Sequence, residues 1–381
     1  MEKIISNLTD YAGREFLSFD QLPLNEVDLA IFSKLAYFNW QVYLPEPDNS
    51  ITLLGLYDIS KRDAFLRINA PKDEDLVLFN SVVGNPRYRD VRALAFSQVF
   101  SKESSEQFAA ITFLLPNETL IVSFRGTDST WTGWKEDFEM AIQTPVPAQK
   151  DASNYLNTIL KLKRKFKNGV YVIGHSKGGN LAIYSYLTLN EKQKKKIFQV
   201  YSFDGPGLNS ELRFSLHYNT YKSHIKKYVP NQSVIGQIYD IDRKEKIVAS
   251  NELLLNQHSL YSWEVDVNND CFATSEMNET VYHNAVLLND WIINATFDEK
   301  QILIETIYDV LTGTKISTMA ELGKHKMTSL IQIYKQISKL DSKTKKKFVE
   351  VLKSFFGFIK NYDKVEFTKS EDIKAVKYLN K

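Results

Sequence analysis

The chain has 381 residues, and at roughly 150 residues per domain this length suggests one large domain or two smaller ones. Lys and Arg (48) nearly balance Asp and Glu (46), and the net charge of +2 argues against a dedicated nucleic-acid binder. An apolar fraction of 43%, with 13% aromatic residues, excludes global disorder. The single thiol, Cys271, excludes an intrachain disulfide and a zinc site built from several cysteines.

The N-terminal segment does not have the pattern of a signal peptide. Residues 1–16 (MEKIISNLTDYAGREF) lack an uninterrupted apolar stretch. The chain also lacks a window of about 18 apolar residues, the length that a membrane-spanning helix needs. The sequence therefore favours a cytoplasmic protein.

Positive charge is concentrated at the C-terminal end of the chain. Residues 301–381 contain 16 Lys and 9 acidic residues, so they have a net charge of +7, and −5 remains for the first 300 residues. This difference predicts two regions, an N-terminal catalytic domain of residues 1–300 and a lysine-rich helical extension of residues 301–381.

The expected elements alternate between strands and helices in the central part of the chain. Residues 25–38 have helical apolar spacing, with Asn25 as N-cap, and residues 109–115 and 120–124 predict an antiparallel hairpin. Further helices and strands are expected at residues 151–167 (helix), 169–173 (strand), 177–189 (helix), and 198–203, 225–229 and 247–249 (strands). Such alternation is typical of an α/β fold with a mostly parallel central sheet flanked by helices.

The last part of the chain is helical in pattern. Apolar residues recur at helical spacing in residues 327–337 and again in 348–359, with lysines between them. Two interpretations remain open. The helices could pack on the main domain with a solvated lysine face, or they could make peripheral contact with an anionic membrane or a partner.

The main chemical signal is the sequence GHSKGG of residues 174–179. It follows an apolar strand and precedes a helix, which is the context of a G-x-S-x-G nucleophile elbow with Ser176 as the nucleophile. The turn strains the serine backbone, and the glycines allow strand and helix to approach closely. His175 is expected to support this turn without taking part in proton transfer. The alternative is an ordinary glycine-rich turn.

A second motif ends an earlier strand. Residues 124–128 (FRGTD) follow the second hairpin strand. An acyl-transfer enzyme needs two preorganised donors for its oxyanion, and one is normally the N–H group after the nucleophile. That group is the amide of Lys177, and Thr127 can supply the second donor with its N–H and its hydroxyl. The alternative is a polar turn without catalytic use.

These motifs carry a resemblance. The FRGTD motif, the segment around Trp134 and Asp137, and the VIGHSKGGN elbow resemble the class 3 lipases of the α/β-hydrolase fold. With its FDGPG and QH…W segments, the chain is most similar to a bacterial family of lipase-like α/β-hydrolases, over roughly residues 25–310. The resemblance implies an α/β-hydrolase fold, a Ser-acid-His triad, ester hydrolysis without a cofactor, and a lid over an apolar acyl pocket. Class 3 lipases usually have Leu where this chain has Lys177, whose side chain we expect to point away from the oxyanion.

The acid and the base are expected downstream of Ser176, because chain order in this fold is serine, acid, histidine. Asp204 ends the next strand, within residues 201–207 (YSFDGPG), and is the preferred acid. Class 3 lipases place the acid after the following strand, where residues 229–233 (VPNQS) have no carboxylate, so Asp240 and Asp242 remain alternative acids. A further alternative is that Asp204 only caps the turn.

His258 is the expected base. It lies in a polar loop after the last expected strand. The remaining histidines precede or begin a strand, lie on an expected helix or belong to the basic tail: His217, His224, His283 and His325.

The sequence thus predicts a serine hydrolase that cleaves a small-molecule or lipid acyl ester. In this mechanism His258 deprotonates Ser176, and Asp204 supports the imidazolium. Phosphate-loop, zinc-protease and dinucleotide motifs are absent, so we expect neither cofactor nor metal. Two alternatives remain, a non-catalytic hydrolase-like interaction protein and a peripheral membrane protein that acts through its basic tail. The sequence leaves the oligomeric state open.

Overall fold

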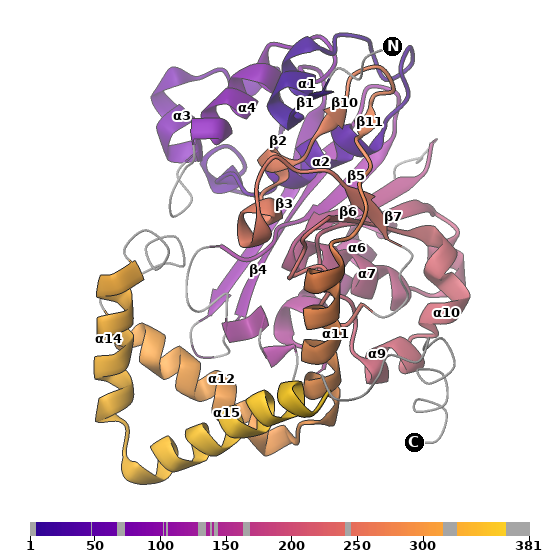
Figure 1. Cartoon of the computed structure of the whole chain (residues 1–381). Coiled ribbons are helices and arrows are strands. Elements are labelled where there is room, and N and C mark those ends of the chain that lie inside the picture. The colour runs from indigo at the N-terminus through magenta and orange to yellow at the C-terminus, as the bar shows by residue number, and fades with distance from the viewer. Residues whose placement is uncertain are drawn as a thin grey trace.

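The computed structural model describes residues 5–46, 48–66, 73–101, 103, 106–128, 135–137, 139–140, 144–162, 168–240, 245–314 and 326–362. Within these ranges an eight-stranded sheet runs through the molecule in the order β2-β3-β4-β5-β6-β7-β8-β9 (Figure 1). Its strands are β2 (Ser50–Thr52), β3 (Arg92–Ser101), β4 (Glu106–Leu114), β5 (Leu120–Phe124), β6 (Val170–His175), β7 (Ile197–Phe203), β8 (Ile225–Pro230) and β9 (Lys246–Val248). A three-stranded antiparallel sheet joins β1 (Ile5–Ser6), β10 (Val265–Asp266) and β11 (Cys271–Phe272).

The sheet changes direction at β5. Strands β2 to β5 pair antiparallel, and β5 to β9 pair parallel. The predicted hairpin at β4 and β5 and the mostly parallel arrangement are confirmed. Strand β3 was not expected, because its register shifts between Leu94 and Ser97, with Ala95 at a φ of 53°, and this bulge interrupts the two-residue alternation of a strand.

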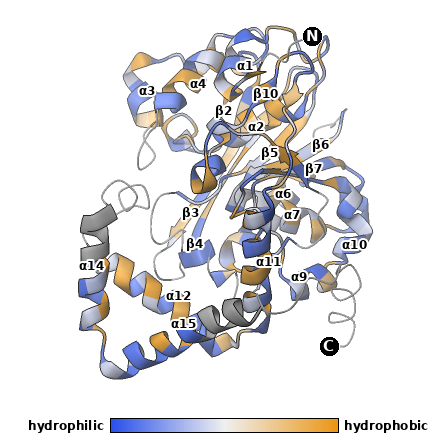
Figure 2. Ribbon diagram, in the orientation of Figure 1, coloured by the Kyte–Doolittle hydropathy of each residue, from blue (hydrophilic) through white to orange (hydrophobic). Residues whose placement is uncertain are grey.

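Helices cover both faces of the sheet. One face packs on α6 (Pro147–Lys161) and α7 (Lys177–Leu187), and the other face packs on α2 (Glu26–Leu35). Alternate residues of the strands divide between these two layers, since Val172 faces the α6–α7 core whereas Ile173 belongs to the α2 core. The central strands β5, β6 and β7 are accordingly rich in apolar residues on both faces, and orange segments run through the sheet in Figure 2.

The expected helix starts are close to the observed ones. Asn25 caps α2 by accepting the N–H groups of Val27 and Asp28, as expected. Helix α6 begins at Pro147, four residues before the expected start, because a proline in the first turn fits a helix N-terminus. Residues 163–167 of the expected helix lie outside the described part of the chain.

Shorter helices surround this layered body. Near the N-terminus lie α1 (Leu8–Arg14), α3 (Ile59–Leu66) and α4 (Asp73–Val83), and after α7 come α8 (Glu191–Lys194), α9 (Ser210–Ser215) and α10 (Tyr218–Tyr221). Short 3-10 helices occupy Trp40–Val42, Leu54–Leu56, Lys222–His224, Leu254–His258 and Leu260–Ser262.

The C-terminal part forms a helical layer below the sheet in Figure 1. It consists of α11 (Glu279–Asn294), α12 (Phe297–Thr312), α14 (Lys326–Lys339) and α15 (Ser342–Tyr362). Helix α15 lies against α11 and α12, and Val351 is buried in a cluster with Tyr239, Trp291 and Ile292. The expected boundary at residue 300 therefore falls within α12, and α15 packs back onto the residues that precede this boundary.

Candidate active site

Ser176 occupies a sharp turn between β6 and α7. Its φ of 58° and ψ of −133° lie outside the regions that an L-residue prefers, a strain of about 1–3 kcal/mol that the surroundings must offset. The Ser176 N–H group is held by the carbonyl oxygen of Phe203 at 2.9 Å. A Cβ atom at Gly178 would lie 2.1 Å from the Phe124 carbonyl oxygen, so only glycine lets α7 approach β5 this closely. The turn has the geometry of a nucleophile elbow.

Asp204 and His258 form a hydrogen-bonded pair although they are 54 residues apart. The distance from His258 Nδ1 to Asp204 Oδ2 is 2.6 Å, and the Asp204 side chain is 1% exposed. The other carboxylate oxygen, Oδ1, accepts the Ser233 hydroxyl and the Gly236 N–H group. A carboxylate with three donors is fixed in position and remains an acceptor for the imidazole.

The other candidates take different places. Asp240 accepts a hydrogen bond from Lys227, and Asp242 lies outside the described residues, as do Trp134 and His325. His283 lies on α11, and His217 and His224 flank α10 before strand β8. Asp204 and His258 are thus the acid and histidine that the fold brings together.

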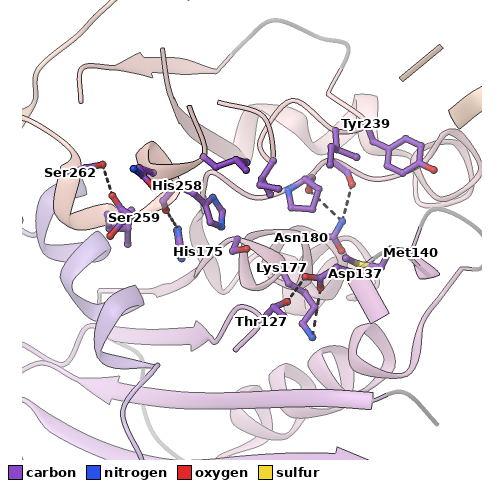
Figure 3. A pocket seen from close by; sticks show the side chains of 18 of the residues that line it. Thr127, Asp137, Met140, His175, Lys177, Asn180, Tyr239, His258, Ser259 and Ser262 are labelled. Carbon is purple, nitrogen blue, oxygen red and sulfur yellow. Dashed lines mark hydrogen bonds and ion pairs between the residues drawn. The ribbon is translucent and has the colours of Figure 1, made fainter. Parts of the chain in front are cut away.

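His175 fixes the segment that holds His258. Its Nε2 lies 2.7 Å from the carbonyl oxygen of His258, and a carbonyl only accepts, so Nε2 carries a proton. Its Nδ1 lies 2.9 Å from the Tyr37 hydroxyl, and burial raises the pKa of Tyr37. The rings of His175 and His258 are 4.6 Å apart between centroids and lie close together in Figure 3. His175 therefore links the elbow to the segment of His258.

Thr127 lies in the loop after β5. Its Oγ1 donates to Asp137 Oδ2 at 2.5 Å, a contact drawn in Figure 3. Because a serine or threonine hydroxyl has one proton, this bond directs the hydroxyl of Thr127 to Asp137. Of the two donors that the sequence suggested for Thr127, the N–H group is the one that this bond does not engage. This differs from the expectation that both the N–H group and the hydroxyl serve.

The Lys177 side chain is buried and paired. Its Nζ lies 2.8 Å from Glu136 Oε2 and 2.8 Å from the carbonyl oxygen of Gln107. The amine is therefore tied to a carboxylate on another segment, while the Lys177 amide begins α7 among the N–H groups that lack an intrahelical partner. The positive end of α7 favours negative charge at this position.

The carboxyl group of Asp137 has a raised pKa in this arrangement. Burial raises its pKa to about 6, against the opposing effects of the Lys177 ammonium group and the Thr127 hydrogen bond. A carboxyl group with a pKa near 6 changes charge within the physiological range, beside the loop that holds Thr127.

A cavity of about 820 Å³ opens at these residues. Ser176, His258, Thr127 and Asp137 line it together with apolar side chains (Figure 3). The apolar lining comes from several parts of the chain: Met140, Ile235, Ile238, Leu255, Leu260, Leu288, Trp291, Ile292, Leu303 and Ile304. Helices α11 and α12 thus supply one wall. A largely apolar cavity of this size with a few polar groups is typical of a small-molecule site.

Sequence reasoning missed four contributors to this site. Tyr37 and Gln107 gave no local signal, since their roles depend on contacts across more than 60 residues of chain. Glu136 adjoins Asp137 in the segment that the resemblance singled out. Ser233 lies in the segment after β8 that lacks a carboxylate, and there it donates to the acid from the preceding strand.

Within the described ranges, His, Cys, Asp and Glu form no group of three that could hold a metal ion. The expectation that the protein needs neither metal nor cofactor stays a prediction. Among the helices of the described segments, none combines the length and the apolar composition needed to cross a bilayer.

The parallel strands β5 to β9, the strained serine between β6 and α7 and the acid at the end of β7 define an α/β-hydrolase fold. Comparison with family models gives the particular family. Residues 82–309 match the model described as Mbeg1-like, which is more than half of the chain, and the protein belongs to this family. No curated protein matches the chain.

Comparison with solved structures finds lipases at low sequence identity. The M37 lipase is 15% identical, over 56% of this chain and 70% of its own, with a TM-score of 0.34. A mutant form of MDLA from Penicillium cyclopium is 10% identical, over 68% and 95% of the two chains, with a TM-score of 0.39. Lipase II from Rhizopus niveus is 13% identical, over 68% and 86%, with a TM-score of 0.34.

Proposed function

We propose that the protein is a serine hydrolase that cleaves carboxylic esters through Ser176, His258 and Asp204. The observation that carries this proposal is the 2.6 Å hydrogen bond between His258 and Asp204, beside a cavity that Ser176 also lines from its elbow. With the His258 Nδ1 proton held by Asp204, the other ring nitrogen is free to act as a base in the neutral imidazole.

The reaction proceeds in two halves. His258 Nε2 removes the hydroxyl proton of Ser176 while Oγ bonds to the acyl carbon, and Asp204 stabilises the imidazolium. When the tetrahedral intermediate collapses, the ester C–O bond breaks and His258 returns the proton to the leaving alcohol. Water then attacks the acyl-enzyme with His258 as base, and the carboxylic acid leaves as Ser176 regains its proton.

The N–H groups of Thr127 and Lys177 stabilise the oxyanion of each tetrahedral intermediate. The Thr127 hydroxyl holds its loop in place through Asp137, and the Lys177 amine is held by Glu136. Both main-chain donors therefore belong to segments that are fixed before the substrate binds. Preorganised donors of this kind need no reorganisation during the reaction.

The apolar lining supports an acyl chain as the part of the substrate that the cavity holds. Side chains from α11 and α12, such as Leu288, Trp291 and Leu303, face this space. An acyl chain gains roughly 0.8 kcal/mol for each CH₂ group that it buries. We therefore expect kcat/KM to rise with acyl length until the cavity is filled.

The test combines a covalent probe with turnover. The wild-type protein should be labelled by a fluorophosphonate and should hydrolyse a series of p-nitrophenyl esters from acetate to dodecanoate. Ser176→Ala should lose the label and at least about 10³-fold in kcat. Full turnover by Ser176→Ala would refute the assignment of the nucleophile. A folded wild-type protein with neither label nor turnover would instead support a non-catalytic interaction protein.

Paired aspartate variants test the acid. Asp204→Asn removes the carboxylate that orients His258, so kcat should fall by about 10³- to 10⁴-fold. Asp240→Asn is the matched control, because Asp240 binds Lys227, and its kcat should change less than about threefold. A larger loss in Asp240→Asn than in Asp204→Asn would assign the acid to Asp240.

A further inference from the structure

One lysine lies on the apolar wall of the cavity. Lys300, Leu303 and Ile304 are spaced by three and four residues on α12, so they share one face of the helix, and all three line the cavity. The neighbouring wall from α11 is also apolar, with Leu288, Trp291 and Ile292. A purely apolar substrate would place this wall against hydrocarbon, where an ammonium group is unfavourable.

The other two lysines that line the cavity are already paired. Lys34 Nζ lies 3.1 Å from Asp75, and Lys177 Nζ lies 2.8 Å from Glu136. For Lys300 the described part of the chain provides neither an ion pair nor a side-chain hydrogen bond. The side chain is half-buried, and this burial lowers the pKa of Lys300, with no carboxylate acting against the shift.

A half-buried lysine on an apolar wall can extend its amine to water. The helix that carries Lys300, however, also contacts the segment of Asp137. Lys135 lies over the ring of Tyr308 on α12, at 4.9 Å from Nζ to the ring centroid. Lys300 thus belongs to the wall that α12 contributes to the same cavity that Ser176 and Thr127 line.

We propose that Lys300 binds the negatively charged group of an amphiphilic acyl substrate, a carboxylate or a phosphate carried on the same molecule as the acyl chain. The substrate class is therefore an anionic acyl ester. This inference rests on the proposed function of Ser176. The apolar walls hold the chain, and the half-buried ammonium group selects ligands that bring an anion with it.

Binding to Ser176→Ala tests the proposal without any turnover. The probes are decyl phosphate, decanoate and 1-decanol below their micellar concentrations, and inorganic phosphate alone, with affinities from calorimetry. The two anionic probes should bind about tenfold more tightly than decanol, as expected for one charged hydrogen bond. Adding Lys300→Gln should reduce this ratio to about one and leave decanol affinity unchanged.

Lys339→Gln is the matched control, because Lys339 is an exposed lysine on α14 and should leave the ratio at about ten. Equal affinity of anionic and neutral probes for Ser176→Ala would overturn the proposal, and so would a preference that Lys300→Gln retains. Binding of inorganic phosphate as tight as that of decyl phosphate would overturn the requirement for an acyl chain. These outcomes are separate from a failure of the proposed hydrolysis, which the fluorophosphonate label reports.

Measurements of kcat/KM then test whether the negative charge of the substrate lies on its acyl part or on its alcohol part. Two pairs of esters are compared, the half p-nitrophenyl ester of a dicarboxylic acid against its methyl-capped form, and a lysophosphatidic acid against the monoacylglycerol with the same chain. A preference for the anionic member that falls about tenfold in Lys300→Gln, in either pair, supports the proposal. The same kcat/KM within each pair for the wild-type protein contradicts it.

Discussion

At the level of single residues, Lys177 and Glu136 form a buried ion pair beside the proposed nucleophile. The two side chains are 1% and 0% exposed, and Glu136 also accepts the N–H groups of Gln107 and Ala148. An ion pair removed from water is stable only while each charge retains its partner and its hydrogen bonds.

We predict that Lys177→Met lowers the free energy of unfolding by about 3–5 kcal/mol, because it leaves the Glu136 carboxylate buried without a cation. Urea denaturation measures the loss. The double variant Lys177→Met/Glu136→Gln should recover part of it, since the uncompensated charge is then absent. A loss below about 1 kcal/mol in the single variant would show that water reaches Glu136.

Asp137 gives a stability that depends on pH. Its folded pKa of about 6 lies above the ordinary value of 3.8, so the folded state binds this proton more tightly than the unfolded state. The carboxyl group therefore costs stability as pH rises from about 4 to 6, and the cost is complete above pH 6.

The wild-type protein should accordingly lose up to about 3 kcal/mol relative to Asp137→Asn between pH 4 and pH 7. The measurement is the difference in free energy of unfolding between the two proteins at each pH. Asp20→Asn, at an exposed position, is the control for the substitution itself. A wild-type protein that becomes more stable relative to Asp137→Asn as the pH rises would contradict the raised pKa of Asp137.

At the level of secondary-structure elements, the contact of α7 with β5 positions the elbow. Any residue larger than glycine at position 178 would bring its Cβ atom to 2.1 Å from the Phe124 carbonyl oxygen, so the helix would have to move from the sheet. Because Ser176 directly precedes this helix, such a movement displaces the proposed nucleophile as well as the N–H group of Lys177.

Gly178→Ala should therefore reduce both stability, by about 1–3 kcal/mol, and the rate of fluorophosphonate labelling, by at least tenfold. Gly84→Ala is the control, because a Cβ atom there would meet no atom within 4 Å, and its stability should change by less than about 0.5 kcal/mol. Equal labelling rates for the wild-type protein and Gly178→Ala would show that the elbow does not depend on this contact.

At the level of the whole molecule, the C-terminal helices have a packed apolar side and an exposed side that is rich in lysine. Helix α15 packs on α11 and α12, with Phe348 and Val351 buried. The exposed lysines with described side chains on α14 and α15 are Lys335, Lys339, Lys343, Lys345, Lys346, Lys347 and Lys353. Packing on the body and contact with an anionic surface are therefore compatible, since they use different sides of the helices.

We predict salt-dependent binding to vesicles that contain phosphatidylserine. Each lysine near an anionic surface contributes about 1 kcal/mol, so reversing the charge of Lys345, Lys346 and Lys347 with glutamate should weaken binding by at least tenfold at low salt. The corresponding arginine variants keep the charge and should bind like the wild-type protein. Co-sedimentation measures binding, and unchanged binding by the glutamate variants would assign any membrane affinity to another surface.

Local sequence patterns were sufficient to predict the sheet from β4 to β9 and the elbow. Apolar runs of strand length, the helix cap at Asn25 and the glycines around Ser176 are all read within a few residues. Chain order and strand ends also narrowed the candidate acid and base to Asp204 and His258, which the structure joins by a hydrogen bond. Asp240 and Asp242 stayed open because spacing does not show which carboxylate reaches the imidazole.

The groups that meet across long separations are known only from the tertiary structure. In the structure Asp204 is hydrogen-bonded to His258, whereas Asp240 is bonded to Lys227. Ser233 contacts Asp204, and Tyr37 contacts His175. The tertiary structure also made α12 a wall of the cavity that includes Lys300, although the charge count had assigned this helix mostly to a separate extension. A local sequence pattern is enough to specify a helix or a strand. The partner of a buried charged group depends instead on how helices and strands pack together, and neighbouring residues in the sequence do not encode that packing.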